Sequence, residues 1–152
     1  MRKFNSIKRY TNLLFMKILD LFPMSGERRY RMAKYCGVRI SKNGFIGRKV
    51  CFDTIRPDLI ELEEGCYITE GCIIYTHYLI PDMFITRKGS WFRFGKVCVK
   101  KNAFLGARSI ICNDVTIGEN SIIGAGSVVT KDVPPNELWA GVPARFIKKI
   151  KN

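Results

Sequence analysis

His77 is the only histidine among the 152 residues, and it is the side chain best suited to moving a proton near neutral pH. An imidazole has an unperturbed pKa of about 6.5, so it can act as a general base under ordinary conditions. Its surroundings, CIIYTHYLIPD at residues 72–82, are mostly apolar. A lone histidine in such a setting commonly makes only structural hydrogen bonds, so its role depends on where the surrounding elements place it.

Six cysteines offer a second kind of chemistry, but their spacing favours neither a metal site nor disulfides. There is no Cys-x-x-Cys pair, and one histidine cannot complete the usual mixed Cys/His zinc sites. Nothing indicates a secreted chain, so the even count does not by itself imply disulfides. We expect small, buried, reduced cysteines and no metal.

The net charge of +13 predicts an anionic partner, which could be nucleic acid, a membrane surface or a phosphorylated small molecule. Nucleic acid is rejected, because the basic residues match no nucleic-acid motif and the aromatic residues cluster in one segment. No apolar run approaches the length of a membrane span, and no cleavage site follows the basic N-terminus. We therefore expect a cytoplasmic protein, which could lie peripherally at the inner face of the membrane.

A six-residue period dominates the C-terminal half of the sequence and predicts the fold. It fits neither a helix nor a plain strand alternation, but it is typical of a short strand and a turn repeated around a solenoid. Three hexapeptides make one triangular coil, and stacked coils bury each other's inner faces. Tight corners favour Gly, Asn and Asp, as in Gly118–Glu119–Asn120 and Asn113–Asp114. The inward positions are Val99, Leu105, Ile111, Ile117, Ile123 and Val129, with Ala103, Ser109, Val115, Ser121, Ser127 and Val133 at the fifth position of each repeat.

The same period begins upstream at residue 40, breaks at Arg56 and resumes over residues 62–74. It then disappears until residue 97, which predicts an extended loop over about 78–95. His77 lies at the root of this loop. A rigid coil would fix the histidine there while the loop shapes a pocket, as suits a catalytic side chain.

The repeats, together with IGAGSVVTKDVPPNELWAGVPARFIKKI at 123–150, resemble the hexapeptide-repeat acyltransferases, and most closely the maltose/galactoside-type and polysaccharide-cluster O-acetyltransferases. The resemblance covers roughly residues 36–150. It implies an all-β solenoid, a left-handed parallel β-helix over 37–135, with an N-terminal helical cap over 1–36. The C-terminal segment, 136–152, would include a short helix. Family members are homotrimers with active sites between neighbouring subunits.

The resemblance also implies catalytic roles. In the family, a histidine at the base of such a loop takes the proton from an acceptor hydroxyl, which then attacks the thioester of acetyl-coenzyme A; this position is His77. The backbone N–H of Ala107 would stabilise the oxyanion. Gly106 and Ala107, like Gly124 and Ala125, would keep the outer wall flat for the pantetheine arm. Repeat geometry alone is the alternative explanation for these small residues.

Polar and aromatic residues complete the implied site. Thr130 and Lys131 match positions near the nucleotide part of coenzyme A, and Arg145 and Lys148 match a segment that reaches its phosphates. A solvated basic tail is the alternative explanation for Arg145 and Lys148. In the loop, Asp82 would orient the imidazole or bind a sugar hydroxyl, unless it is only a surface carboxylate, and Trp91 would contact the acceptor. The acid that often accompanies the family's loop glycine is missing at Gly89–Ser90–Trp91, so the acceptor is less well defined than the chemistry.

Two helices are expected before the repeats, one near residues 7–22 and one in GERRYRMAKYCG, residues 26–37. They would cap the open end of the solenoid. They could also form a basic amphipathic surface on anionic lipid, close to a lipid-linked acceptor.

These observations predict an acetyl-CoA-dependent O-acetyltransferase that acts on a saccharide hydroxyl. An N-acyltransferase of an amino sugar would share the fold and the cofactor, and a non-catalytic β-helix scaffold would share the fold alone. A carbonic-anhydrase-type β-helix needs three histidines on zinc and is excluded.

Overall fold

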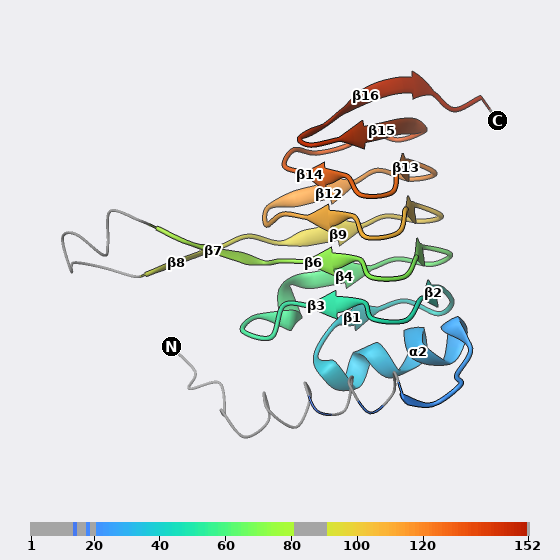
Figure 1. Cartoon of the computed structure of the whole chain (residues 1–152), viewed down its shortest axis with the longest axis vertical. Coiled ribbons are helices and arrows are strands. Elements are labelled where there is room, and N and C mark those ends of the chain that lie inside the picture. The colour runs from blue at the N-terminus through green and yellow to red at the C-terminus, as the bar shows by residue number, and fades with distance from the viewer. Residues whose placement is uncertain (1–13, 15–17, 19–20, 81–90, 152) are drawn as a thin grey trace.

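The computed structural model describes residues 14, 18, 21–80 and 91–151, and most of these form a stack of triangular coils (Figure 1). Each coil contributes one short strand to each of three parallel sheets, which we name faces A, B and C in chain order. Face A holds β1 (Arg39–Ile40), β4 (Ile60–Leu62), β9 (Val97–Val99) and β12 (Val115–Ile117). Face C holds β3 (Cys51–Phe52), β6 (Ile73–Ile74), β11 (Ile110–Ile111) and β14 (Val128–Val129).

Face B is the largest of the three sheets. It holds β2 (Phe45–Ile46), β5 (Tyr67–Ile68), β10 (Phe104–Leu105), β13 (Ile122–Ile123), β15 (Glu137–Gly141) and β16 (Ala144–Lys149). The coils stack in register, so that Leu105 lies between Ile68 and Ile123. Every aliphatic and fifth-position residue that the period placed inward from Val99 onward is buried. The predicted triangular solenoid and its core are therefore confirmed.

The corners of the coils use left-handed backbone conformations. Asn120 and Asp114 have φ values of 55° and 60°, which confirms the predicted corner chemistry. Asn120 also belongs to a ladder in which the Asn102 amide donates to Asn120, and the Asn120 amide donates to Asn136. Arg108 adopts a φ of 59° at another corner, where the sequence offered no turn signal.

Gly106 is required by the close stacking of two coils. A Cβ atom at this position would lie 2.5 Å from the Ala125 nitrogen and 2.6 Å from the Ile123 oxygen, both backbone atoms that cannot rotate away. We expect Gly106→Ala to lower the free energy of unfolding by about 1–3 kcal/mol through overpacking, measured by denaturant unfolding. Gly126→Asn is the matched control, because nothing lies within 4 Å of its Cβ position and asparagine tolerates its φ of 68°. Equal losses in the two variants would contradict this explanation.

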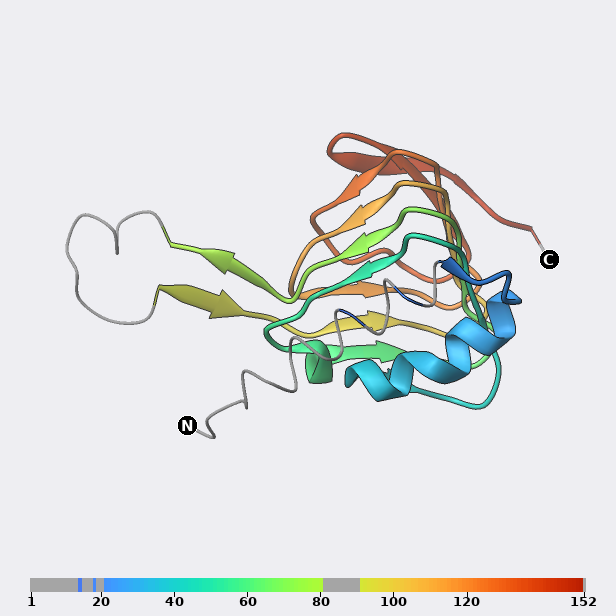
Figure 2. The same cartoon turned by 60° about the horizontal axis from the view of Figure 1, so that its bottom comes forward.

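The period breaks where the chain leaves the stack as a hairpin (Figure 2). β7 (His77–Leu79) pairs antiparallel with β8 (Phe92–Phe94), and His77 lies opposite Phe94. Gly95 returns the chain to the stack and donates its N–H to the Thr76 oxygen at 2.8 Å. The predicted loop is thus a two-stranded hairpin at its base, and His77 is the first residue of its first strand.

The helix α2 (Gly26–Ala33) lies against the N-terminal end of the stack and is followed by a 3-10 turn, η1 (Lys34–Cys36). Ser25 caps its first turn by accepting from the Arg28 N–H. The buried Tyr30 reaches the solenoid, where its hydroxyl lies 3.0 Å from the Leu62 oxygen. Burial is the main reason that the pKa of Tyr30 lies far above its ordinary value. α2 lies within residues 26–37, where the second helix was expected, and its role as a cap stays a prediction. Most of the first expected helix, near 7–22, lies outside the described residues.

The C-terminal prediction was partly wrong, because the short helix is absent from residues 136–151. Instead, β15 pairs with β13 and so extends face B by one more strand, and β16 folds back antiparallel on β15. A helix here would have left the β13 backbone groups without strand partners. The remaining short element, η2 (Pro57–Leu59), follows Arg56 and explains the phase slip there.

The cysteines are free thiols, and four of them are buried. The expectation of burial was wrong for Cys51, which is exposed, and for Cys112, which is half-buried. Within the described part of the chain, no helix has the length and apolarity needed to cross a membrane.

Candidate active site

His77 is paired with a buried carboxylate at the corner between faces C and A, which we call the CA corner. Its Nδ1 atom lies 2.5 Å from Oδ2 of Asp53, one coil earlier. The Asp53 side chain is fully buried, whereas 20% of the His77 side chain is exposed. The pair therefore has one protected partner and one partner that solvent or a substrate can reach.

Backbone amides hold the Asp53 carboxylate in place. Its Oδ1 accepts from the N–H groups of Ile55 and Arg56 at 2.7 and 3.2 Å, and its Oδ2 accepts from the Thr76 N–H at 2.9 Å. Burial raises the pKa of Asp53, but the hydrogen bonds from Thr76, His77 and Ile55 outweigh burial and hold it below the ordinary value. Asp53 is therefore a fixed anion at neutral pH.

This carboxylate sets the tautomer of His77. An anion at Nδ1 favours a proton on that nitrogen, which leaves the lone pair on Nε2. Among the described residues, Nε2 has no hydrogen-bond partner. The arrangement can therefore take a proton at Nε2, and Asp53 would stabilise the resulting imidazolium.

Aromatic rings surround the imidazole. The Phe92 ring centroid lies 5.2 Å from that of His77 and meets it edge-on, Phe94 lies 6.1 Å away, and Tyr75 lies 6.3 Å away. Arg56 extends over Phe94, with its Cζ atom 5.7 Å from the ring centroid. These rings restrict the orientation of the imidazole and form an apolar wall on the hairpin side.

Sequence reasoning missed Asp53. It considered Asp82 as the orienting carboxylate, but Asp82 lies outside the described residues and its role stays a prediction. The contact depends on the pairing of Phe52 with Ile74, which brings together the residues that follow these two strands. The break in the period at Arg56, three residues after Asp53, hides this pairing from a reading of the repeats.

The predicted small-residue wall lies at a different corner. Gly106, Ala107, Gly124 and Ala125 lie at the corner between faces B and C, the BC corner, where Gly126 donates its N–H to the Ala107 oxygen at 2.8 Å. Ala107 and Ala125 are exposed, and their N–H groups have no acceptor among the described residues. This corner therefore carries small exposed residues and offers backbone donors.

The other predicted residues divide among the corners. Thr130 and Lys131 are exposed and lie at the CA corner, the corner that also holds His77. Arg145 is exposed on β16 opposite Ala140, which packs over Gly124 near the BC corner. Lys148 pairs with Leu138 farther along β15.

Trp91 is exposed at the start of the hairpin's return strand, and its carbonyl accepts from the Ile80 N–H at 3.1 Å. The structure thus places Trp91 on the same hairpin as His77. Within the described part of the chain, no cluster of His, Cys, Asp and Glu is arranged to hold a metal ion.

Within one chain, His77 is far from the Ala107 N–H. Arg108, next to Ala107, donates its N–H to the Glu70 oxygen at 2.9 Å, so Ala107 lies near the start of the face C strand that leads to His77. Residues 72–76, which include β6, alone span about 13 Å at about 3.3 Å per residue. One acyl carbon cannot lie beside both groups of the same chain.

Residues 99–131 match the model of the bacterial transferase hexapeptide, six repeats. The chain is 31% identical to the serine acetyltransferase of Buchnera aphidicola subsp. Schizaphis graminum, over 96% of this chain and 60% of that protein. It is also similar to the structure of a maltose O-acetyltransferase from Clostridium difficile 630, with a TM-score of 0.71, 26% identity, and coverage of 97% of this chain and 88% of the other. This chain belongs to the hexapeptide-repeat family of left-handed β-helix acetyltransferases.

A further solved structure is similar to this chain over a shorter length. A variant of AntD, an N-acyltransferase from Bacillus cereus, was crystallised with dTDP-4-amino-4,6-dideoxyglucose and coenzyme A. It has a TM-score of 0.64 and 28% identity, and the similarity covers 76% of this chain and 64% of AntD. The chain thus spans less than two thirds of both AntD and the serine acetyltransferase. The family predicted from the repeats is confirmed.

Proposed function

We propose that this protein is an acetyl-CoA-dependent O-acetyltransferase that acetylates a saccharide hydroxyl, including one on a lipid-linked precursor. The observation that carries the proposal is the contact of Asp53 with His77 Nδ1, which prepares Nε2 as a base at an accessible corner. A scaffold without activity has no need of a buried carboxylate fixed by three amides and aimed at a half-buried imidazole.

The residues suit the steps of acetyl transfer. Acetyl-CoA supplies the acetyl group as a thioester. His77 Nε2 accepts the proton of the acceptor hydroxyl while the hydroxyl oxygen bonds to the acyl carbon. The Ala107 N–H donates to the oxyanion that forms, and the His77 imidazolium then protonates the departing thiolate. Asp53 keeps its charge throughout and stabilises the imidazolium.

Coenzyme A fits the chemistry of the BC corner. Its pantetheine arm needs a flat surface with unpaired backbone donors, which Ala107 and Ala125 supply. Its phosphates need cations, and Arg145 is exposed close to this corner. Lys131 and Lys148 are the further cations we assign to the phosphates, with Thr130 beside the nucleotide.

We further propose that the active unit is a homotrimer. Since His77 and Ala107 of one chain are too far apart to share an acyl carbon, the CA corner of one copy must face the BC corner of another. A closed three-fold arrangement would form three identical clefts from these two corners.

Two other acceptors also have specific support. AntD carries an amino sugar, so N-acylation is the second candidate. The Buchnera relative is a serine acetyltransferase, so the serine hydroxyl is a third. The saccharide hydroxyl is preferred because the maltose O-acetyltransferase matches nearly the whole of both chains.

A thiol-release assay with acetyl-CoA tests the proposal. The full chain would be incubated separately with each class of acceptor. These are the neutral saccharides (maltose and a galactoside), an amino sugar, and serine. We expect acceptor-dependent release of coenzyme A with a neutral saccharide. If coenzyme A were released only with the amino sugar, or only with serine, that compound would be the acceptor instead of a saccharide hydroxyl. No release with any acceptor, together with no binding of acetyl-CoA by calorimetry, would support a non-catalytic scaffold.

A further inference from the structure

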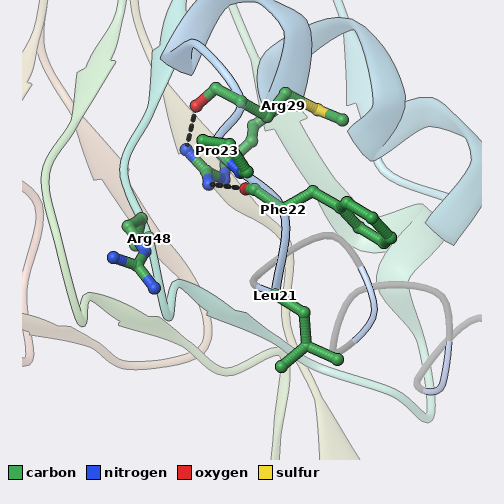
Figure 3. A pocket seen from close by; sticks show the side chains of 6 residues that line it. Leu21, Phe22, Pro23, Arg29 and Arg48 are labelled. Atoms are coloured by element: carbon green, nitrogen blue, oxygen red, sulfur yellow. Dashed lines mark hydrogen bonds between the residues drawn. The ribbon is translucent and has the colours of Figure 1, made fainter.

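The N-terminal end of the stack carries apolar side chains on a fixed backbone. Leu21 and Phe22 are 80% and 59% exposed. Beneath them, the buried Arg29 of α2 donates from Nη1 to the Met24 oxygen at 2.6 Å and from Nη2 to the Phe22 oxygen at 3.4 Å. In Figure 3 the Arg29 guanidinium contacts this backbone while the Leu21 and Phe22 side chains extend away from it. The buried Arg29 thus fixes the backbone of this turn, while the side chains of Leu21 and Phe22 stay exposed to solvent.

The apolar surface continues upstream. Leu14, Ile18 and Leu21 are helical and exposed, and their spacing places them on one helical face, which Phe22 directly follows. Exposed apolar groups that gather in this way commonly mark an interaction surface.

Exposed basic residues lie next to this apolar surface and on the helix that follows it. Arg48 lines the same hollow as Leu21 and Phe22 (Figure 3). On α2, Arg28 and Arg31 are exposed. Glu27 is the only acidic residue between positions 21 and 48 of the sequence, and Glu70 lines a neighbouring hollow with Glu27 and Arg48.

We infer that Leu21 and Phe22, together with Arg48 and the exposed arginines of α2, form a docking surface for an anionic phospholipid bilayer. Apolar side chains that enter the headgroup boundary, with cations beside them, are the pattern of interfacial membrane binding. A second copy of the chain is disfavoured as the occupant, because it would bring two basic surfaces together. Acetyl transfer does not depend on this surface, so the inference and the proposed function can fail separately.

Vesicle sedimentation of the full chain tests the inference. We expect binding to vesicles of phosphatidylcholine with phosphatidylglycerol, and at least about tenfold weaker binding to phosphatidylcholine alone or in high salt. Replacing both Leu21 and Phe22 with serine should weaken binding to the anionic vesicles by at least about tenfold. Arg29 is kept, so the turn should stay folded, and thiol release with a soluble acceptor should be unchanged.

The opposite end of the stack offers a matched control. Phe146 and Ile147 are 48% and 55% exposed on β16, next to Lys148 and Lys149. Replacing Phe146 and Ile147 with serine should leave vesicle binding intact. The inference is overturned if the wild type does not bind anionic vesicles, if both double variants lose binding equally, or if the Leu21/Phe22 variant binds like the wild type. A change of oligomeric state in that variant, measured by light scattering, would assign the surface to a second copy instead.

Discussion

Replacing His77 with alanine is expected to lower the turnover of acetyl transfer by about 10²–10⁴-fold, the usual contribution of a general base. The reason is local, because Nε2 of His77 is the basic atom that Asp53 prepares at this corner. Binding of acetyl-CoA should be retained, because Ala107, Ala125 and Arg145 lie at or near the BC corner. Thr130 and Lys131 share the CA corner with His77, but they follow β14, two coils after the β6 strand that precedes His77. Thiol release measures the first expectation, and titration calorimetry measures the second.

Two further measurements separate chemistry from folding. His77 is partly exposed, and the contacts of its ring with described residues are those with neighbouring rings and with Asp53. We therefore expect thermal unfolding of the variant to change little apart from the lost Asp53 contact. Tyr75→Phe is a useful control, because it keeps the ring beside His77 and removes only a hydroxyl. Thiol release that persists undiminished in His77→Ala would exclude His77 as the base.

The sequence was sufficient to predict the solenoid, because its inward positions repeat strictly. Leu105 and Ile123 occupy stacked core positions, and any shift of register would have moved them to the surface. The end of the repeat was harder to predict, since residues 137–149 follow no hexapeptide rule. Their strands form because the edge left by β13 needs a partner, and that need is visible only once the stack exists.

The site was predicted only in part, for a related reason. His77 could be found because it is the lone histidine and lies where the period stops. Asp53 could not be selected from its own segment, since its partner is 24 positions away and meets it only when one coil stacks on another. The separation of His77 from Ala107 likewise depends on which corner each residue occupies, a property that the period alone does not give.

Asp53→Asn is the second variant with a large expected effect. Asparagine keeps the shape of the side chain, but its amide NH₂ cannot accept from both the Thr76 N–H and the imidazole, as Oδ2 does. An NH₂ group facing Nδ1 would move the imidazole proton to Nε2, where the base must be unprotonated. We expect turnover to fall by about 10²-fold or more, with acetyl-CoA binding unchanged.

The stability of the fold should also depend on the ionisation of the Asp53 carboxylate. The pKa of Asp53 is lowered in the folded protein relative to an unfolded aspartate, whose pKa is about 3.9. A lowered folded pKa means that the carboxylate stabilises the fold above pH 4 and that this contribution is lost as the pH falls through the folded pKa. The difference in melting temperature between wild type and Asp53→Asn should therefore be present at pH 7 and shrink below pH 4.

Asp132→Asn is the matched control for both effects. Its carboxylate also accepts a backbone N–H from a residue in the neighbouring coil, with Thr116 N at 2.7 Å from Oδ1, but it is exposed. This control should retain turnover and lose little stability, because an exposed acceptor is readily replaced by water. If Asp53→Asn kept the turnover of the wild type, the carboxylate would be structural, and the proton on Nδ1 would need another explanation. If turnover fell in Asp53→Asn but not in Asp132→Asn, the loss would be attributed to the orientation of His77 by Asp53.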